Sequence, residues 1–127
     1  MIEQIVFEQL RDNLGVSESF GTVSYLEADP ADALPRLVVW QVDDPSAKAF
    51  LAYYGGQARV QCDVWSKDRH EIPSLRATVR DALRTLRGQY GEVTITSVVI
   101  SNEVTRALST DGIYGGVVDA IIEWTKE

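Results

Sequence analysis

The chain has 127 residues, of which 45% are hydrophobic and 24% charged, so it has the size of one domain and enough apolar residues to bury a core. Nineteen acidic residues against twelve lysines and arginines give a formal net charge of −7, which disfavours specific nucleic-acid binding because proteins that neutralise phosphates are basic. One cysteine excludes an internal disulfide, and no apolar run approaches the roughly 18 residues of a membrane span.

The N-terminal segment predicts a helix from Ile2 to Leu14. Its apolar residues recur at helical spacing, and Gly15 follows as a candidate C-terminal cap. Acidic residues stand where a secretory signal would carry basic ones, so we expect synthesis in the cytoplasm. From the length of the chain we expect a single domain over residues 1–127.

Two strands and an acidic loop are expected next. The segment from Phe20 to Leu26 is a candidate short strand, and Leu37–Val42 is rich in β-branched and aromatic residues. The intervening stretch 27–35 contains two prolines, which predict a loop. Acidic residues cluster in this loop and directly after the second strand: Glu27, Asp29, Asp32, Asp43 and Asp44.

The middle of the chain predicts a half-buried strand from Gln57 to Ser66, because apolar and polar residues alternate along it. Cys62 falls on the apolar face, whereas Trp65 falls on the polar face and is a candidate interface residue. Residues 49–54 are a further candidate strand. The glycine pairs 55–56 and 115–116 lack a phosphate-binding context and are interpreted as turn or bulge glycines.

A second helix is predicted from Ile72 to Leu86, where apolar residues again recur at helical spacing. Its start stays open, because Asp68 resembles a capping residue while Pro73 prefers the first helical turn. Strands are predicted from Val93 to Glu103 and from Val117 to Thr125, with a turn at 108–112 between them. Short connections favour hairpins, so we expect an α+β fold: a mostly antiparallel twisted sheet with two main helices packed on one side.

No catalytic, metal or cofactor site is expected. Cys62 is more typical of a small core residue than of a nucleophile, and the only histidine, His70, lies in a charged turn. One histidine and one distant cysteine do not make a zinc site, and the acidic residues lack calcium-loop spacing. An enzyme would have to rely on scattered carboxylates.

Four arginines form one basic row on the second helix, opposite its apolar face: Arg76, Arg80, Arg84 and Arg87. The plain interpretation is a solvated helix face, with the last two also favoured by the helix dipole. The alternative is a subunit interface. Residues 1–55 hold nine acids and three bases, a net of −6, whereas residues 56–127 hold ten and nine, a net of −1, so another copy's first half is an acidic candidate partner.

Three strings in this order resemble the tail terminator, or tail completion, proteins of long-tailed bacteriophages. They are Leu34 to Trp40, Ala58 to Trp65 followed by the helix Leu75 to Leu83, and Gly112 to Trp124. The resemblance covers most of the chain, which departs from the pattern at Gly115-Gly116 and at Pro73.

The resemblance implies a non-enzymatic virion protein at the head-proximal end of the tail. Such a protein forms a hexameric homo-oligomer, a ring that caps the tail tube protein, ends its polymerisation and offers a joining surface to the head-side connector protein. We hypothesise that Glu27, Asp29, Asp32, Asp43 and Asp44 give the ring an acidic lumen or docking loop, which would repel the DNA that passes through. No membrane contact and no specific nucleic-acid binding are expected.

Two other classes stay open. A head-closure or other head–tail neck protein would bind the portal complex instead of tail tubes. A dimeric small-ligand-binding α/β module would use a sheet edge for dimerisation and would carry an apolar pocket.

Overall fold

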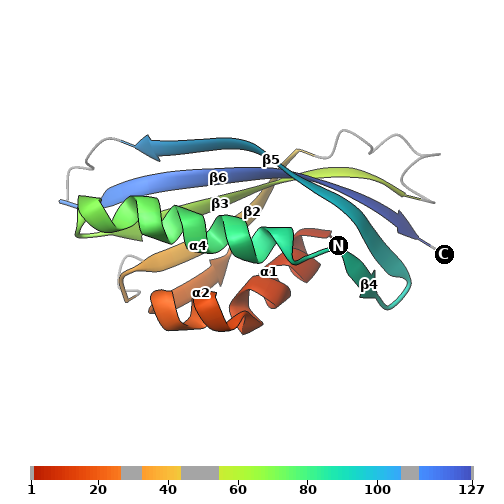
Figure 1. Ribbon diagram of the computed structural model, residues 1–127, viewed down its shortest axis with the longest axis horizontal. Coiled ribbons are helices and arrows are strands. Elements are labelled where there is room, and N and C mark those ends of the chain that lie inside the picture. Colours follow the sequence, from red (N-terminus) through yellow and green to blue (C-terminus); the bar gives the residue numbers. More distant parts are fainter. Residues whose placement is uncertain (1, 27–32, 44–54, 107–111, 127) are drawn as a thin grey trace.

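The computed structural model describes residues 2–26, 33–43, 55–106 and 112–126 (Figure 1). The helices are α1 (Ile2–Asp12), α2 (Leu14–Ser19) and α4 (Ile72–Arg84), and a 3-10 turn, η1 (Arg69–Glu71), precedes the last of them. The strands are β1 (Thr22–Tyr25), β2 (Arg36–Asp43), β3 (Gly55–Ser66), β4 (Gly88–Tyr90), β5 (Val93–Arg106) and β6 (Tyr114–Lys126). None of the described helices is long and apolar enough to cross a membrane.

The strands form one sheet in the order β1-β2-β3-β6-β5-β4. All neighbours are antiparallel except β1 and β2, which are parallel. The predicted α+β class with a mostly antiparallel sheet is therefore confirmed. Short connections favoured hairpins, so the parallel pair corrects that expectation for β1 and β2. The pairing ends at Leu26, whose backbone N–H donates to the carbonyl of Val39 at 2.9 Å.

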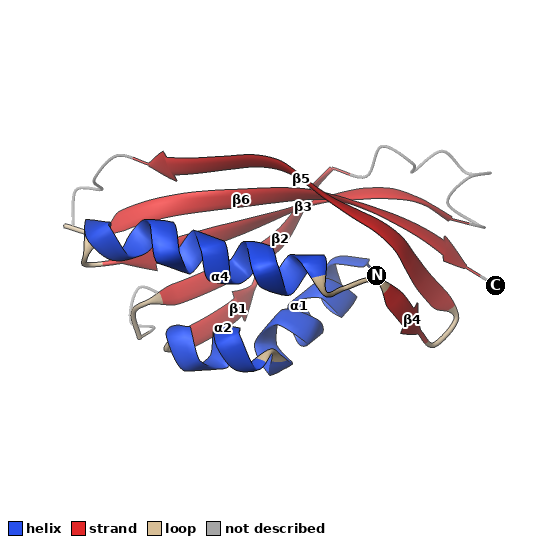
Figure 2. Cartoon of the chain, viewed as in Figure 1, coloured by secondary structure: helices blue, strands red, loops and turns tan. Residues whose placement is uncertain are grey.

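The hydrophobic core lies between the sheet and the three helices, which are on one face of it (Figure 2). Fully buried side chains from α1 and α4, such as Val6 and Val79, belong to the same cluster as Val60 and Cys62 of β3 and Ile122 of β6. The alternation predicted for β3 and the helical spacing predicted for the second helix are both confirmed, because they select these inward residues. We call the opposite side of the sheet the open face.

The N-terminal segment forms two helices, not the single helix predicted from Ile2 to Leu14. Asn13 interrupts them because its side-chain oxygen accepts the backbone N–H of Val16 at 3.1 Å and so caps α2. Leu14 therefore starts a new helix and is 70% exposed. Gly15 lies inside α2 and is not the predicted C-terminal cap.

The two signals at the start of the second helix, Asp68 and Pro73, belong to two successive elements, η1 and α4. Asp68 caps η1 by accepting the backbone N–H of His70 at 2.9 Å, and Pro73 occupies the first turn of α4. The hydroxyl of Ser66 donates to Glu71 at 2.9 Å and ties the end of β3 to this turn.

Several strands differ in extent from their predictions. β5 continues to Arg106, and β4 was not predicted because a three-residue strand is too short to show alternation. The candidate strand at 49–54, most of the acidic loop (27–32) and most of the turn at 108–112 lie outside the described residues.

Gly115 and Gly116 lie inside β6 in regular register with β3 and β5, so the interpretation as turn or bulge glycines was wrong. Gly55 and Gly56 likewise form the first two residues of β3. At Gly116 a Cβ atom would lie 2.8 Å from Cγ2 of Ile72 and 3.1 Å from Cγ2 of Val64. Glycine is needed there because α4 and β3 leave no room for a side chain.

Candidate functional site

The arginine row consists of Arg76, Arg80 and Arg84 of α4 and of Arg87, which lies just beyond α4 and not on the helix as predicted, because α4 ends at Arg84. The row divides into two halves. Arg76 and Arg80 are half-buried against the sheet, and a Cβ atom on Gly116 would lie 3.0 Å from Cδ of Arg76. Arg84 and Arg87 are exposed, and neither side chain forms an ion pair with the described residues. The spacing of the arginines suggested a uniformly solvated face, but only Arg84 and Arg87 are exposed.

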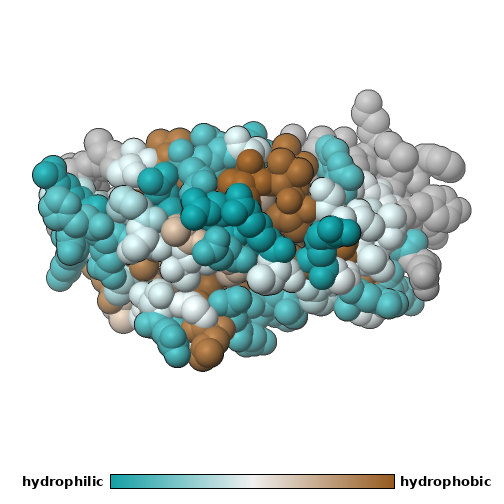
Figure 3. Space-filling model, viewed as in Figure 1, coloured by the Kyte–Doolittle hydropathy of each residue, from teal (hydrophilic) through white to brown (hydrophobic). Residues whose placement is uncertain are grey.

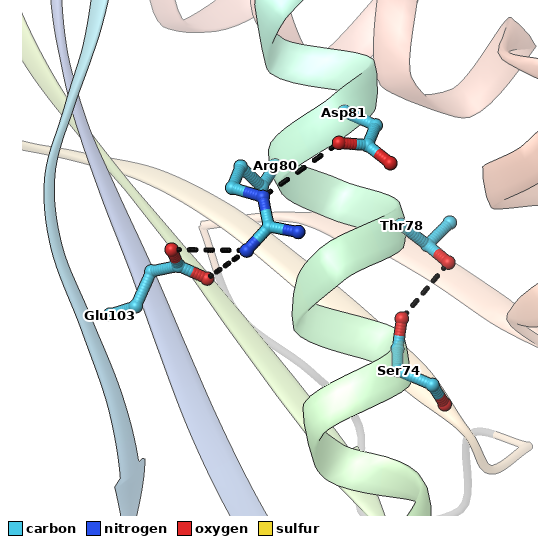
Figure 4. A network of polar contacts seen from close by, with 5 residues as sticks. All are labelled: Ser74, Thr78, Arg80, Asp81 and Glu103. Carbon is cyan, nitrogen blue, oxygen red and sulfur yellow. Dashed lines mark hydrogen bonds and ion pairs between the residues drawn. The ribbon is translucent and has the colours of Figure 1, made fainter.

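Arg80 joins α4 to β5. Its Nη1 lies 3.3 Å from both carboxylate oxygens of Glu103, and its Nε lies 3.7 Å from Asp81 (Figure 4). The side chains of Arg80 and Glu103 are 31% and 27% exposed, so solvent screens the pair only in part. This contact fixes the arginine row beside β5.

A second polar cluster lies on the open face, across β2, β3 and β6. Asp63 accepts Nε1 of Trp40 at 3.1 Å and Nε2 of Gln61 at 2.8 Å. Nη2 of Arg59 lies 3.3 Å from Oδ2 of Asp119, whose side chain is only 4% exposed. Because a buried carboxylate is costly without a partner, Arg59 stabilises this part of the sheet.

Trp65 lies on the open face, as the alternation of β3 predicted. Its register partner on β6 is Gly115, and a Cβ atom there would come within 2.9 Å of the indole ring. The missing side chain lets the indole lie over the neighbouring strand. Its role as an interface residue stays a prediction.

The predicted acidic lumen or docking loop is mostly outside the described residues. Glu27, Asp29, Asp32 and Asp44 lie in the undescribed segments, and for Asp43 only the backbone position at the end of β2 is described. The role of these acidic residues as a lumen or docking loop stays a prediction.

Cys62 is fully buried in the core. Burial raises the pKa of its thiol, and the nearby carboxylates of Asp63 and Asp119 raise it further, so the reactive thiolate is disfavoured. His70 is exposed in η1. Within the described residues, no group of three or more histidine, cysteine, aspartate or glutamate side chains is arranged to hold a metal ion.

Comparison with known proteins identifies the family. The sequence matches the family described as tail completion protein gp17 over residues 4–122, which is nearly its whole length. The chain belongs to this family. The chain therefore has a role in phage tail completion. No curated protein matches the chain in sequence.

Two solved structures have a similar fold. A chain from the virion of a native gene transfer agent particle has a TM-score of 0.71 at 17% identity, covering 98% of this chain and 94% of that one. The gp17 protein of bacteriophage SPP1 has a TM-score of 0.58 at 17% identity, covering 95% of this chain and 86% of that one. At this identity the two matches show a shared fold.

In this family member, sequence reasoning missed two surface features. The charged cluster of Arg59, Asp63 and Asp119 lies on alternate positions of β3 and β6, so the alternation of those strands could have placed it on one face. The second feature is the outer edge of β5. Because β4 pairs only with Val93–Ile95, the side of β5 that faces away from β6 has no described strand beside it from Thr96 to Arg106.

Proposed function

We propose that the chain is a tail terminator: a single-domain protein, over residues 1–127, that assembles as a hexameric ring on the head-proximal end of a tail tube. The ring ends polymerisation of the tube protein and presents a surface to the head-side connector. The observation that carries this proposal is the match to the tail completion protein gp17 family over residues 4–122. The similarity of fold to a chain of a gene transfer agent virion supports it.

A ring is compatible with the surface chemistry of the chain. The first half carries a net of −6, while two exposed arginines, Arg84 and Arg87, lie at the end of α4 and just beyond it. Unlike surfaces on one subunit favour a heterologous contact, and such a contact closes into a ring when its rotation is right. The arginine row and Trp65 remain the proposed subunit interface.

The acidic segments have a role in this proposal. Glu27, Asp29, Asp32, Asp43 and Asp44 line the lumen or a docking loop, where their charge repels the phosphates of DNA in transit. A chain with this function needs neither catalysis nor a cofactor. It is made in the host cytoplasm and ends in the virion.

The test is polymerisation of purified tail tube protein with and without the chain. We expect tubes that stop elongating once the chain is added, with a narrower length distribution measured by electron microscopy. Pull-down with the portal complex in place of tubes would indicate a head-closure protein. A strict dimer that leaves tube growth unchanged would favour the small-ligand-binding module.

A further inference from the structure

The sheet has a free edge at each end. At one end, the outer side of β5, which faces away from β6, has no described partner strand from Thr96 to Arg106. At the other end, β1 pairs only with β2, so no described strand covers the outer side of Thr22–Tyr25. We call these the β5 edge and the β1 edge. Unpaired N–H and C=O groups along such edges can accept another strand.

The β5 edge has few of the features that protect sheet edges. Between Thr96 and Arg106 there is no proline and no lysine, and Glu103 is held by Arg80. Register shifts between Ile95 and Ser97 and between Ile100 and Asn102 interrupt the ladder. They leave a regular stretch, Ser97–Ile100, that is as long as the four residues of β1.

The large apolar side chains that the described residues expose most are found at these two ends. Val99 and Val104 lie on β5 and are 55% and 41% exposed. Leu26 directly follows β1 and is 61% exposed, while Leu14 starts α2 and is 70% exposed. Joining the two edges would bury apolar surface on both.

Charge is also divided between the two ends, on the face that carries the helices. The contact between Arg80 and Glu103 places the arginine row beside β5, and the exposed Arg84 and Arg87 continue it. On the other side, Tyr25 of β1 donates its hydroxyl to Glu3 of α1 at 3.1 Å, and Glu18 of α2 is exposed. In Figure 3, which shows this face, hydrophilic residues gather over α4 and an apolar patch lies next to them.

We propose that copies of this chain join head to tail through their sheet edges: the β1 edge of one copy adds to the β5 edge of the next. The sheet then continues from copy to copy with all helices on one face. Acidic residues of α1 and α2 meet Arg84 and Arg87 of the neighbour, and Leu26 packs near Val99. This inference rests on the proposed ring and names the contact that would build it.

The test is a charge-swap experiment on the full chain. One variant carries R84E and R87E, and the other carries E3K and E18K. The matched control carries K67E and R69E, which reverses two exposed positive charges at η1, outside both edge strands. Analytical ultracentrifugation and native mass spectrometry measure self-association, and thermal melting checks that each variant folds.

Each swapped variant alone should associate at least roughly tenfold more weakly than the wild type, because like charges then face each other across the contact. Mixing the two variants should restore association, since every edge again meets its opposite charge. The control should behave as the wild type. Swapped variants that associate normally, a mixture that stays dissociated, or a wild type that is monomeric at all concentrations and on tubes would each overturn the proposal.

The same samples separate this inference from the proposed function. If the R84E/R87E variant caps tubes as well as the wild type does, the edge contact is wrong and the terminator function stands. If the swap pattern is observed but no sample affects tube growth, the contact is correct and the proposed function is wrong.

Discussion

Replacing Gly116 by alanine should destabilise the chain through a steric conflict on the helix side of β6. The new Cβ would lie 2.8 Å from Cγ2 of Ile72 and 3.1 Å from Cγ2 of Val64, and both side chains are fully buried. Neither neighbour can move outward, so α4 must shift away from the sheet.

The expected loss follows from two opposing effects. Overpacking of this kind costs about 1–3 kcal/mol, whereas removing a glycine from a strand returns roughly 0.5–1 kcal/mol. Because Ile72 and Val64 are fully buried, the upper part of the overpacking range applies, about 2–3 kcal/mol, and the net loss in unfolding free energy is about 1–2.5 kcal/mol. For a domain of this size, that lowers Tm by roughly 4–9 °C.

Gly115→Ala is the matched control, because it makes the same change one residue earlier on the same strand. Its Cβ would lie 2.9 Å from the Trp65 ring, which lies on the open face and is only half-buried, so the ring can swing away. We expect a loss below about 1 kcal/mol. Urea unfolding followed by circular dichroism measures both. Equal losses, or no loss for Gly116→Ala, would refute the close packing of α4 on β6.

Three further outcomes are expected. Arg59→Ala leaves the buried carboxylate of Asp119 without its ion-pair partner and should cost about 1–3 kcal/mol of unfolding free energy; adding Asp119→Asn should recover part of the loss, and an unchanged urea midpoint for Arg59→Ala would contradict this. Burial raises the pKa of the Cys62 thiol, so this residue should resist iodoacetamide at pH 8 to 9 (around the ordinary thiol pKa) until urea unfolds the chain. Rapid labelling of the folded chain, measured by mass spectrometry, would contradict the burial of Cys62. Trp40→Phe removes the donor to Asp63 and should cost about 0.5–1.5 kcal/mol, measured by the same urea titration; a stabilised variant would argue against that hydrogen bond.

Local patterns in the sequence were enough to place the main elements. The spacing of apolar residues on α4 and the alternation along β3 both reflect one buried side, so they assign Val79 and Cys62 to the core and Trp65 to the open face. The two signals at Asp68 and Pro73 were also correct, although the sequence alone did not show that they serve successive elements.

Features that depend on distant contacts could not be predicted. The spacing of the arginines showed one helix face, but only the fold brings Arg80 to Glu103, which is 23 residues away. The need for glycine at 116 comes from α4 and β3 on either side of it. The parallel pairing of β1 with β2 could not be predicted either, because the four residues of β1 do not show the direction in which a neighbouring strand pairs with them.

The most direct test of the terminator assignment is electron microscopy of tail tubes incubated with the purified chain and averaged at their two ends. We expect ring-shaped density at one end only, with six copies of the chain, and tubes that no longer elongate when more tube protein is added. Density spread along the tube wall, or bare ends that continue to grow, would contradict it.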